Sequence, residues 1–187
     1  GNPSSLHQLG TNAFRILEAS RKQIADLLGV KPEEIFFTSG GTESDNWAIK
    51  GIAFEKATFG KHIIISAIEH PAVSESAKWL RTQGFEVSCA PVTAQGVVDV
   101  DALATLIRPD TILISIMAVN NEMGAIQPIK AISHLLANQP TITFHVDAVQ
   151  AIGKISVSDY MTNRVDLASF SGHKFHGVRG VGSVSYT

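Results

Sequence analysis

The sequence predicts an α/β fold in which helices cover both faces of a mostly parallel sheet. Short apolar runs typical of buried strands alternate along the chain with segments whose apolar residues recur at helical spacing. The 187 residues suffice for one domain with a sizeable core, and they contain no internal repeat, low-complexity tract or linker. We therefore predict one layered α/β/α domain over residues 1–187.

The elements follow in order. Residues 6–28 are predicted to form an amphipathic helix, because apolar residues recur every three or four positions and Gly29 follows the last of them. Strands are predicted in the apolar runs at residues 34–39, 62–68, 85–91, 111–119, 141–148 and 165–171. Helices are predicted between several of these runs, near residues 43–58, 71–83, 101–107 and 128–138. The last residues, 180–187, have the pattern of another strand.

The composition excludes several classes of function. Lys and Arg number 15 against 17 Asp and Glu, so no basic surface for nucleic acid or an anionic membrane is expected. No apolar run is long enough to cross a bilayer and the N-terminus is unlike a signal peptide, so the default expectation is a cytoplasmic location. Charged residues make up 17%, below the typical ~25%, which suggests that more protein covers part of the surface. No metal site is predicted.

The single cysteine and the two ends of the sequence carry further information. Cys89 lies in an alternating, strand-like segment and is interpreted as a buried structural thiol, since it has no partner for an internal disulfide. The sequence begins without methionine and stops within a predicted strand. We therefore expect it to be a piece of a longer protein.

Ligands of such sheets bind beyond the carboxyl ends of the strands, so the residues after each strand are the candidates for function. Gly40 and Gly41 follow the first strand and permit a tight turn before a helix that would start at Thr42. The free N–H groups of that helix would suit a phosphate. A capping turn with Thr42 as N-cap and Asp45 as its acidic partner is the alternative, and the motif alone favours it.

Two more strand ends carry polar side chains. His70 precedes Pro71 at a helix start, where its ring could lie against an aromatic ligand or cap the helix. Asn121 lies in "NNEMG" and could hydrogen-bond a ring hydroxyl, or it could be an ordinary turn residue. Both alternatives stay open for each residue.

The last two strands end in the most distinctive groups. Asp147 ends an apolar run, with Gln150 three residues on, and a carboxylate there needs a cation such as a protonated pyridine nitrogen, a salt bridge or a capping role. "SFSGHKFHG" then supplies Ser171, His173 and Lys174. Lys174 follows a buried strand, where an amine can become nucleophilic toward carbonyls, although any lysine can instead extend to the surface. Together these groups match the parts of pyridoxal 5'-phosphate.

Six motifs in order closely resemble the cysteine desulfurases, which belong to the class V aminotransferases among the fold-type I pyridoxal-phosphate enzymes. They are "GNPSSLHQLG", "FTSGGTESDNWAIKG", "EHPAV", "NNEMGAIQPI", "HVDAVQAIGK" and "SFSGHKFHGVRGVG", and the resemblance spans essentially the whole sequence. It implies the large cofactor-binding domain of that fold. It also implies the branch that serves iron–sulfur cluster assembly.

The resemblance assigns a role to each candidate. Lys174 resembles the Schiff-base lysine and His70 the stacking histidine, and both would be catalytic by moving protons. Asp147 resembles the partner of the ring nitrogen. The remaining assignments are the residues near the ring oxygen and the phosphate-binding set, namely Asn121 and Gln150 for the former and Gly41, Thr42, Ser171 and His173 for the latter.

The implied reaction converts L-cysteine to alanine and leaves a persulfide on a mobile-loop cysteine, from which an acceptor protein takes the sulfur. The resemblance also implies a homodimer. The family's N-terminal stretch and its C-terminal small domain, with the nucleophilic cysteine and the substrate arginine, are expected to lie outside this sequence. We therefore expect the chain alone not to release sulfide from cysteine.

Two alternatives remain open. Another class V enzyme, such as a selenocysteine lyase, kynureninase or aminotransferase, would share the cofactor residues. A non-catalytic binding module would keep the fold and serve a regulatory or sulfur-acceptor partner.

Overall fold

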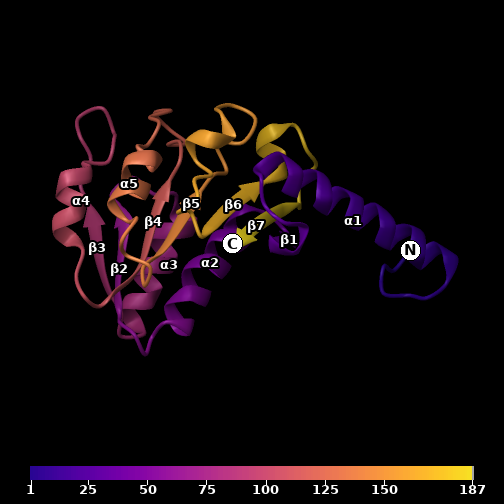
Figure 1. Cartoon of the computed structure of the whole chain (residues 1–187), viewed down its shortest axis with the longest axis horizontal. Coiled ribbons are helices and arrows are strands. Elements are labelled where there is room, and N and C mark those ends of the chain that lie inside the picture. The colour runs from indigo at the N-terminus through magenta and orange to yellow at the C-terminus, as the bar shows by residue number, and fades with distance from the viewer. Residues whose placement is uncertain (187) are drawn as a thin grey trace.

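A computed structural model, which describes residues 1–186, contains one seven-stranded sheet with the order β1-β7-β6-β5-β4-β2-β3 (Figure 1). The strands are β1 Ile35–Thr38, β2 His62–Ser66, β3 Glu86–Ala90, β4 Thr111–Met117, β5 Thr143–Asp147, β6 Leu167–Ser171 and β7 Gly182–Tyr186. β3, β2, β4, β5 and β6 are parallel, whereas β7 runs antiparallel to both β6 and β1. The mostly parallel α/β sheet predicted from the sequence is confirmed.

Helices lie on both faces of the sheet, and alternate strand residues point to two separate cores. α2 Gly41–Glu55 and α3 Pro71–Thr82 pack with Ile63, Ile65 and Leu113 on one face. α4 Val100–Leu106 and α5 Ile129–Leu135 pack with Ile64, Ile114 and Ile116 on the other. Three 3-10 turns complete the elements, at Pro32–Glu34 (η1), Val157–Asp159 (η2) and Gly172–Phe175 (η3). In such a layered sheet, the carboxyl ends of the parallel strands and the N-termini of the helices that follow them lie at the same end of the sheet.

The first helix, α1 Gln8–Leu28, ends where the sequence predicts but does not pack as expected. Gly29 ends it in the left-handed conformation, with φ 72°. Its apolar positions predict a buried face, yet Leu9 and Ile16 are each 69% exposed. The reason is visible in Figure 1, where α1 extends away from the sheet and reaches it only near its C-terminal end, around Ala25 and Leu28.

Cys89 lies on β3, as predicted, but its side chain is exposed, so the prediction of a buried thiol is wrong. β3 is the edge strand and has a neighbour on one side only. Within residues 1–186, none of the helices combines the length and the apolar character that crossing a bilayer requires.

Candidate functional site

A pocket of about 290 Å³ lies at the carboxyl ends of β4, β5 and β6, where the N-termini of α2 and α3 meet them. All nine residues that the resemblance assigns to the cofactor site line it, together with Asp45, Met117 and Val149. The lining residues are Gly41, Thr42, Asp45, His70, Met117, Asn121, Asp147, Val149, Gln150, Ser171, His173 and Lys174.

The start of α2 forms one wall. Gly40 is the N-cap, and the first helical hydrogen bond runs from the N–H of Ser44 to the Gly40 carbonyl at 3.1 Å. The N–H groups of the residues between them therefore precede the helical ladder. A Cβ on Gly41 would lie 2.7 Å from Val149 Cγ2, so only glycine leaves this approach open.

The alternative in which Thr42 is the N-cap and Asp45 its acidic partner is wrong. Thr42 lies inside the helix rather than at its cap, and Asp45 is buried, 1% exposed, rather than turned back to the helix start. Glu43, in the first turn of the helix, reaches back past the cap instead: its carboxylate accepts hydrogen bonds at 2.6 Å from both the N–H and the hydroxyl of Ser39. Both hydrogen bonds lower the pKa of Glu43, and the bond from the Ser39 hydroxyl has the larger effect.

The turn after β6 lies beside the start of α2, because a Cβ on Gly41 would be 3.3 Å from Ser171 Cβ. Ser171 is buried at the end of the strand, and its Oγ lies 3.0 Å from His173 Nδ1. Lys174 follows within η3 and lines the pocket, but it is exposed. Of the two alternatives left open for Lys174, the exposed position is the one found, and the residue lines the pocket from that position. His176 and Arg179 also lie on the surface.

His70 caps a helix and also lies at the pocket, so the capping role is found and the contact with an aromatic ligand stays a prediction. Its Nδ1 accepts a hydrogen bond from the N–H of Ala72 at 3.1 Å, which caps α3, and its ring also lines the pocket.

Asn121 and Gln150 lie on the remaining rim. The turn role considered for Asn121 belongs to its neighbour Asn120, whose Oδ1 accepts from the N–H groups of Glu122 at 3.0 Å and Met123 at 2.8 Å. Asn121 itself lines the pocket. Gln150 Oε1 accepts from Lys154 Nζ at 2.6 Å, which leaves its amide N–H₂ as the donor available to a ligand.

Asp147 is the buried acid of the predicted site. It is 5% exposed, and its Oδ1 accepts from the N–H of Val149 at 2.9 Å. Burial raises the pKa of Asp147 above its ordinary value, and the Val149 N–H and nearby His70 offset only part of that rise. None of the ion pairs among residues 1–186 involves Asp147, so the salt-bridge alternative is not found. A buried carboxylate without a cation, beside free helical N–H groups, fits a phosphorylated pyridinium.

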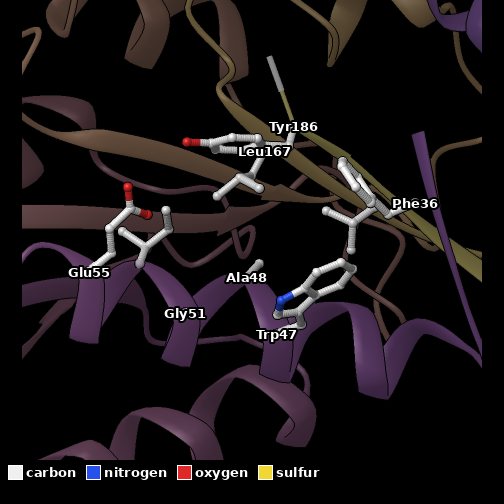
Figure 2. Close-up of a pocket in the computed structure, with 9 residues that line it drawn as sticks. Phe36, Trp47, Ala48, Gly51, Glu55, Leu167 and Tyr186 are labelled. Carbon is white, nitrogen blue, oxygen red and sulfur yellow. The ribbon is translucent and has the colours of Figure 1, made fainter. Parts of the chain in front are cut away.

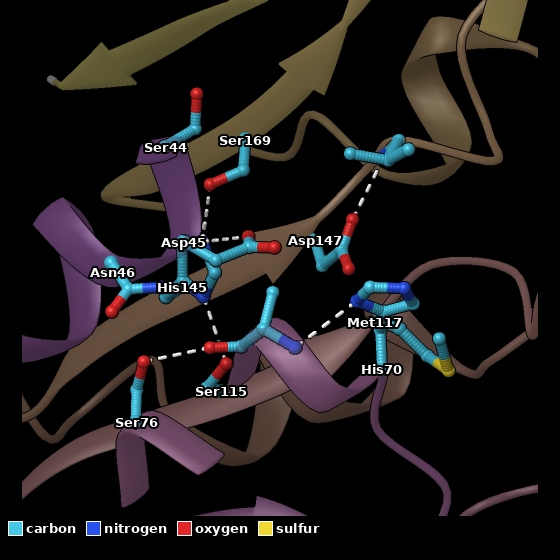
Figure 3. A network of polar contacts seen from close by, with 12 residues as sticks. Ser44, Asp45, Asn46, His70, Ser76, Ser115, Met117, His145, Asp147 and Ser169 are labelled. Carbon is cyan, nitrogen blue, oxygen red and sulfur yellow. Dashed lines mark hydrogen bonds and ion pairs between the residues drawn. The ribbon is translucent and has the colours of Figure 1, made fainter. Parts of the chain in front are cut away.

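Three further titratable groups lie at or near the pocket, namely Asp45, His145 and Glu69, and no ligand-binding role is predicted for them from the sequence. Asp45 and His145, both labelled in Figure 3, are almost completely buried, whereas Glu69 is half-buried. His145 Nε2 lies 3.7 Å from Asp45 Oδ1, and Glu69 accepts from the N–H of Met117 at 2.9 Å. Burial raises the pKa of Glu69 to about 8 and lowers that of His145 to about 3. One signal could have found His145, because it precedes Asp147 by two residues on a strand and shares its face.

These acids do not form a metal centre. Within residues 1–186, no group of three or more His, Cys, Asp and Glu residues is arranged to hold an ion.

A second hollow, of about 340 Å³, lies between α2 and the β7 side of the sheet (Figure 2). Phe36, Trp47 and Tyr186 surround it, and Glu55 is its only charged residue. It holds none of the predicted site residues and lacks convergent polar groups for chemistry.

Comparison with known proteins agrees with the geometry. A homologue from Lactobacillus delbrueckii subsp. bulgaricus, named NifS/IcsS protein homolog, is 58% identical over 97% of this chain and 47% of its own length. Cysteine desulfurase IscS of Methanosarcina thermophila is 53% identical over 98% of the chain and 45% of its own length. The chain thus spans about half the length of the curated relatives it matches.

Solved structures show the same fold. A NifS-like protein superposes with a TM-score of 0.94 at 45% identity, over 100% of this chain and 51% of its own. A structure described as SspA in complex with cysteine gives 0.91 at 40% identity, over 100% and 53%. The sequence model described as Aminotransferase class-V matches residues 1–187. With the pocket and these matches together, the chain belongs to the class V aminotransferase family.

Proposed function

We propose that this chain is the cofactor-binding part of a pyridoxal-phosphate-dependent cysteine desulfurase. The observation that carries the proposal is the single pocket in which a helix N-terminus, an imidazole, a buried carboxylate and a lysine converge. Each of them meets a different part of the cofactor, and no simpler ligand uses all four.

The start of α2 would hold the phosphate. Its leading N–H groups and the Thr42 hydroxyl are donors, and Ser171 with His173 adds polar groups from the facing turn. Gly41 keeps the backbone accessible, because any larger residue would meet Val149.

The other groups would orient the ring. His70 presents an imidazole held in place by the α3 cap, and Asp147 presents a carboxylate to the ring nitrogen. Asn121 and Gln150 would donate to the ring oxygen. Lys174 would supply the amine that bonds the cofactor aldehyde and, with His70, would move protons at the substrate.

Pyridoxal phosphate, when bound, supplies an aldehyde that condenses with amines and a ring that withdraws electrons from the attached carbon. For the whole protein we propose L-cysteine as substrate, alanine as product and transfer of the sulfur to an acceptor protein, for example in iron–sulfur cluster assembly. The names of the relatives support this choice among class V activities. We place the protein in the cytoplasm.

The proposed assembly is a homodimer. The exposed apolar residues of α1, among them Leu9, Ile16 and Leu27, offer a surface that a second subunit would cover. Sedimentation of the purified chain tests this directly.

The test of cofactor binding compares pyridoxal phosphate with pyridoxal, which lacks the phosphate, in absorbance titrations. The proposal expects the phosphate to improve the dissociation constant at least tenfold, and Thr42→Ala to remove much of that gain. Thr105→Ala, on the opposite face of the sheet, should leave it unchanged. Equal affinity for both compounds would contradict the phosphate site.

A further inference from the structure

Asp45 is a buried carboxyl group that the proposed cofactor contacts do not use. It is 1% exposed on the first turns of α2, and its Oδ1 has no hydrogen-bond partner within residues 1–186. The one basic atom within ion-pair distance in that range is Nε2 of His145, at 3.7 Å. An ionised Asp45 would be a buried charge without a cation, which is strongly unfavourable.

His145 does not supply that cation. It is completely buried on β5, between Ser115 Oγ at 2.8 Å from Nδ1 and Ser169 Oγ at 2.9 Å from Nε2 (Figure 3). Hydroxyls can donate or accept, so two hydroxyl contacts satisfy a neutral ring. Burial lowers the pKa of His145 to about 3, which keeps the ring uncharged near neutral pH.

Asp147 brings a second carboxyl group to the same place. It follows His145 by two residues on β5, pairs in register with Ser169 and lines the pocket together with Asp45. Burial raises the pKa of Asp45 well above its ordinary value, and the negative charge of Asp147 raises it further. A hydrogen bond from Ser169 lowers it, and Glu69 adds a smaller increase.

The two carboxyl groups differ in what stabilises their charge. Asp147 accepts the Val149 N–H and faces His70, and both favour its ionised form. His173 and Lys174 line the same pocket from η3. Asp45 lines that pocket too, but the groups that act on its charge are the Ser169 hydroxyl and two other acids, Asp147 and Glu69, and its ion-pair neighbour His145 is neutral.

We propose that Asp45 is held as a neutral carboxylic acid beside Asp147, so that the pair carries one negative charge and Asp147 bears it. Asp45 is thereby a positioning residue, because it leaves Asp147 as the single anion of the pair facing the ring nitrogen. Its carboxyl group also has a proton that it can donate in a hydrogen bond to a neighbouring group. The inference rests on the proposed cofactor site for its purpose. The charge states themselves can be measured without any cofactor.

The experiment is a carbon-13 NMR titration of the chain labelled at the aspartate carboxyl carbons. Asp45→Asn and Asp147→Asn assign the two buried resonances, and Asp110, whose pKa is lowered by its hydrogen bonds with Arg108, serves as the ionised reference. Near pH 7 the Asp45 carbon should show the chemical shift of a protonated carboxyl group, while Asp147 shows that of an ionised one.

The variants give an asymmetric second result. Asp147→Asn should lower the titration midpoint of Asp45 by about one unit or more, because the like charge is gone. Asp45→Asn should leave the Asp147 midpoint unchanged, because a neutral amide replaces a neutral acid. Ionised Asp45 or protonated Asp147 near pH 7 in the unmodified chain would overturn the inference, and one folded variant is enough to assign both buried resonances. Failure to bind pyridoxal phosphate would instead count against the proposed function and leave this titration readable.

Discussion

His70 Nδ1 accepts a hydrogen bond from the backbone N–H of Ala72, 3.1 Å away, while the same imidazole lines the pocket. Because Nδ1 is the acceptor, the neutral ring carries its proton on Nε2. The bond to the helix start therefore fixes both the orientation and the tautomer of the ring. The side chain that caps α3 is therefore also placed at the pocket, and its contact with a bound ring is a prediction.

The two functions of His70 can be separated by substitution. His70→Asn should keep the cap, because asparagine is among the best N-cap residues, whereas His70→Ala should lose about 1 kcal/mol of unfolding free energy. Both variants should bind pyridoxal phosphate roughly three- to tenfold more weakly, since both lose the stacking ring. Urea denaturation and absorbance titration measure the two effects. Full cofactor affinity in His70→Asn would show that the ring does not stack on the cofactor.

Two glycines of α2 provide a matched pair. A Cβ on Gly41 would lie 2.7 Å from Val149 Cγ2 and 3.3 Å from Ser171 Cβ, whereas a Cβ on Gly51 would meet only Trp47 Cδ1, at 3.7 Å. Gly41→Ala should therefore narrow the phosphate site and weaken pyridoxal phosphate binding at least tenfold. Gly51→Ala should leave binding unchanged and stabilise the helix by roughly 0.5–1 kcal/mol. If Gly41→Ala bound the cofactor normally, the phosphate would lie elsewhere.

Glu69 should make folding stability depend on pH. Burial raises its pKa from 4.5 to about 8, so between these values the folded chain holds a proton that the unfolded chain has lost. The free energy of unfolding should therefore fall as pH rises through that window. In Glu69→Gln the fall should be smaller, by an amount on the order of a few kcal/mol. Denaturant titrations at several pH values measure it.

A matched control for this effect is Glu75→Gln, which changes an exposed glutamate paired with Lys78. Its stability curve should run parallel to that of the unmodified chain. A Glu69→Gln curve that also runs parallel would mean that Glu69 is ionised in the folded state.

Asp147 should act through the ring nitrogen alone. Asp147→Asn should weaken pyridoxal phosphate binding about ten- to hundredfold, because the protonated ring nitrogen would lose the buried carboxylate that pairs with it. A cofactor analogue with carbon in place of the ring nitrogen should bind the unmodified chain and Asp147→Asn equally. If Asp147→Asn still bound pyridoxal phosphate more tightly than the carbon analogue, another group would have to contact the nitrogen. Asp110→Asn, at an exposed carboxylate paired with Arg108, is the control.

Much of the fold and of the pocket could be predicted from the sequence because strand ends in a parallel sheet converge. Asp147 and Ser171 are far apart in the sequence, but each ends an apolar run, and the strands that carry them, β5 and β6, are neighbours in the sheet. The pattern around Thr42 could not separate the two alternatives, because Ser, Thr and Asp near a helix start suit a cap and a ligand site equally well.

Other features depend on tertiary packing that no local pattern contains. The ion-pair distance between Asp45 and His145 arises only because α2 crosses β5, and the burial of Glu69 only because its loop meets β4. The exposure of Leu9 follows from the direction in which α1 leaves the sheet. Apolar spacing predicts that a helix has an apolar face, but not what covers that face.

The central claim is that Lys174 and the pocket around it bind pyridoxal phosphate. The most direct measurement is borohydride reduction of the chain mixed with the cofactor, followed by peptide mass mapping. The account predicts a label on Lys174 and none on Lys154, which lies beside Gln150 at the same rim. A folded chain that carries no label, or a label spread over exposed lysines, would contradict it.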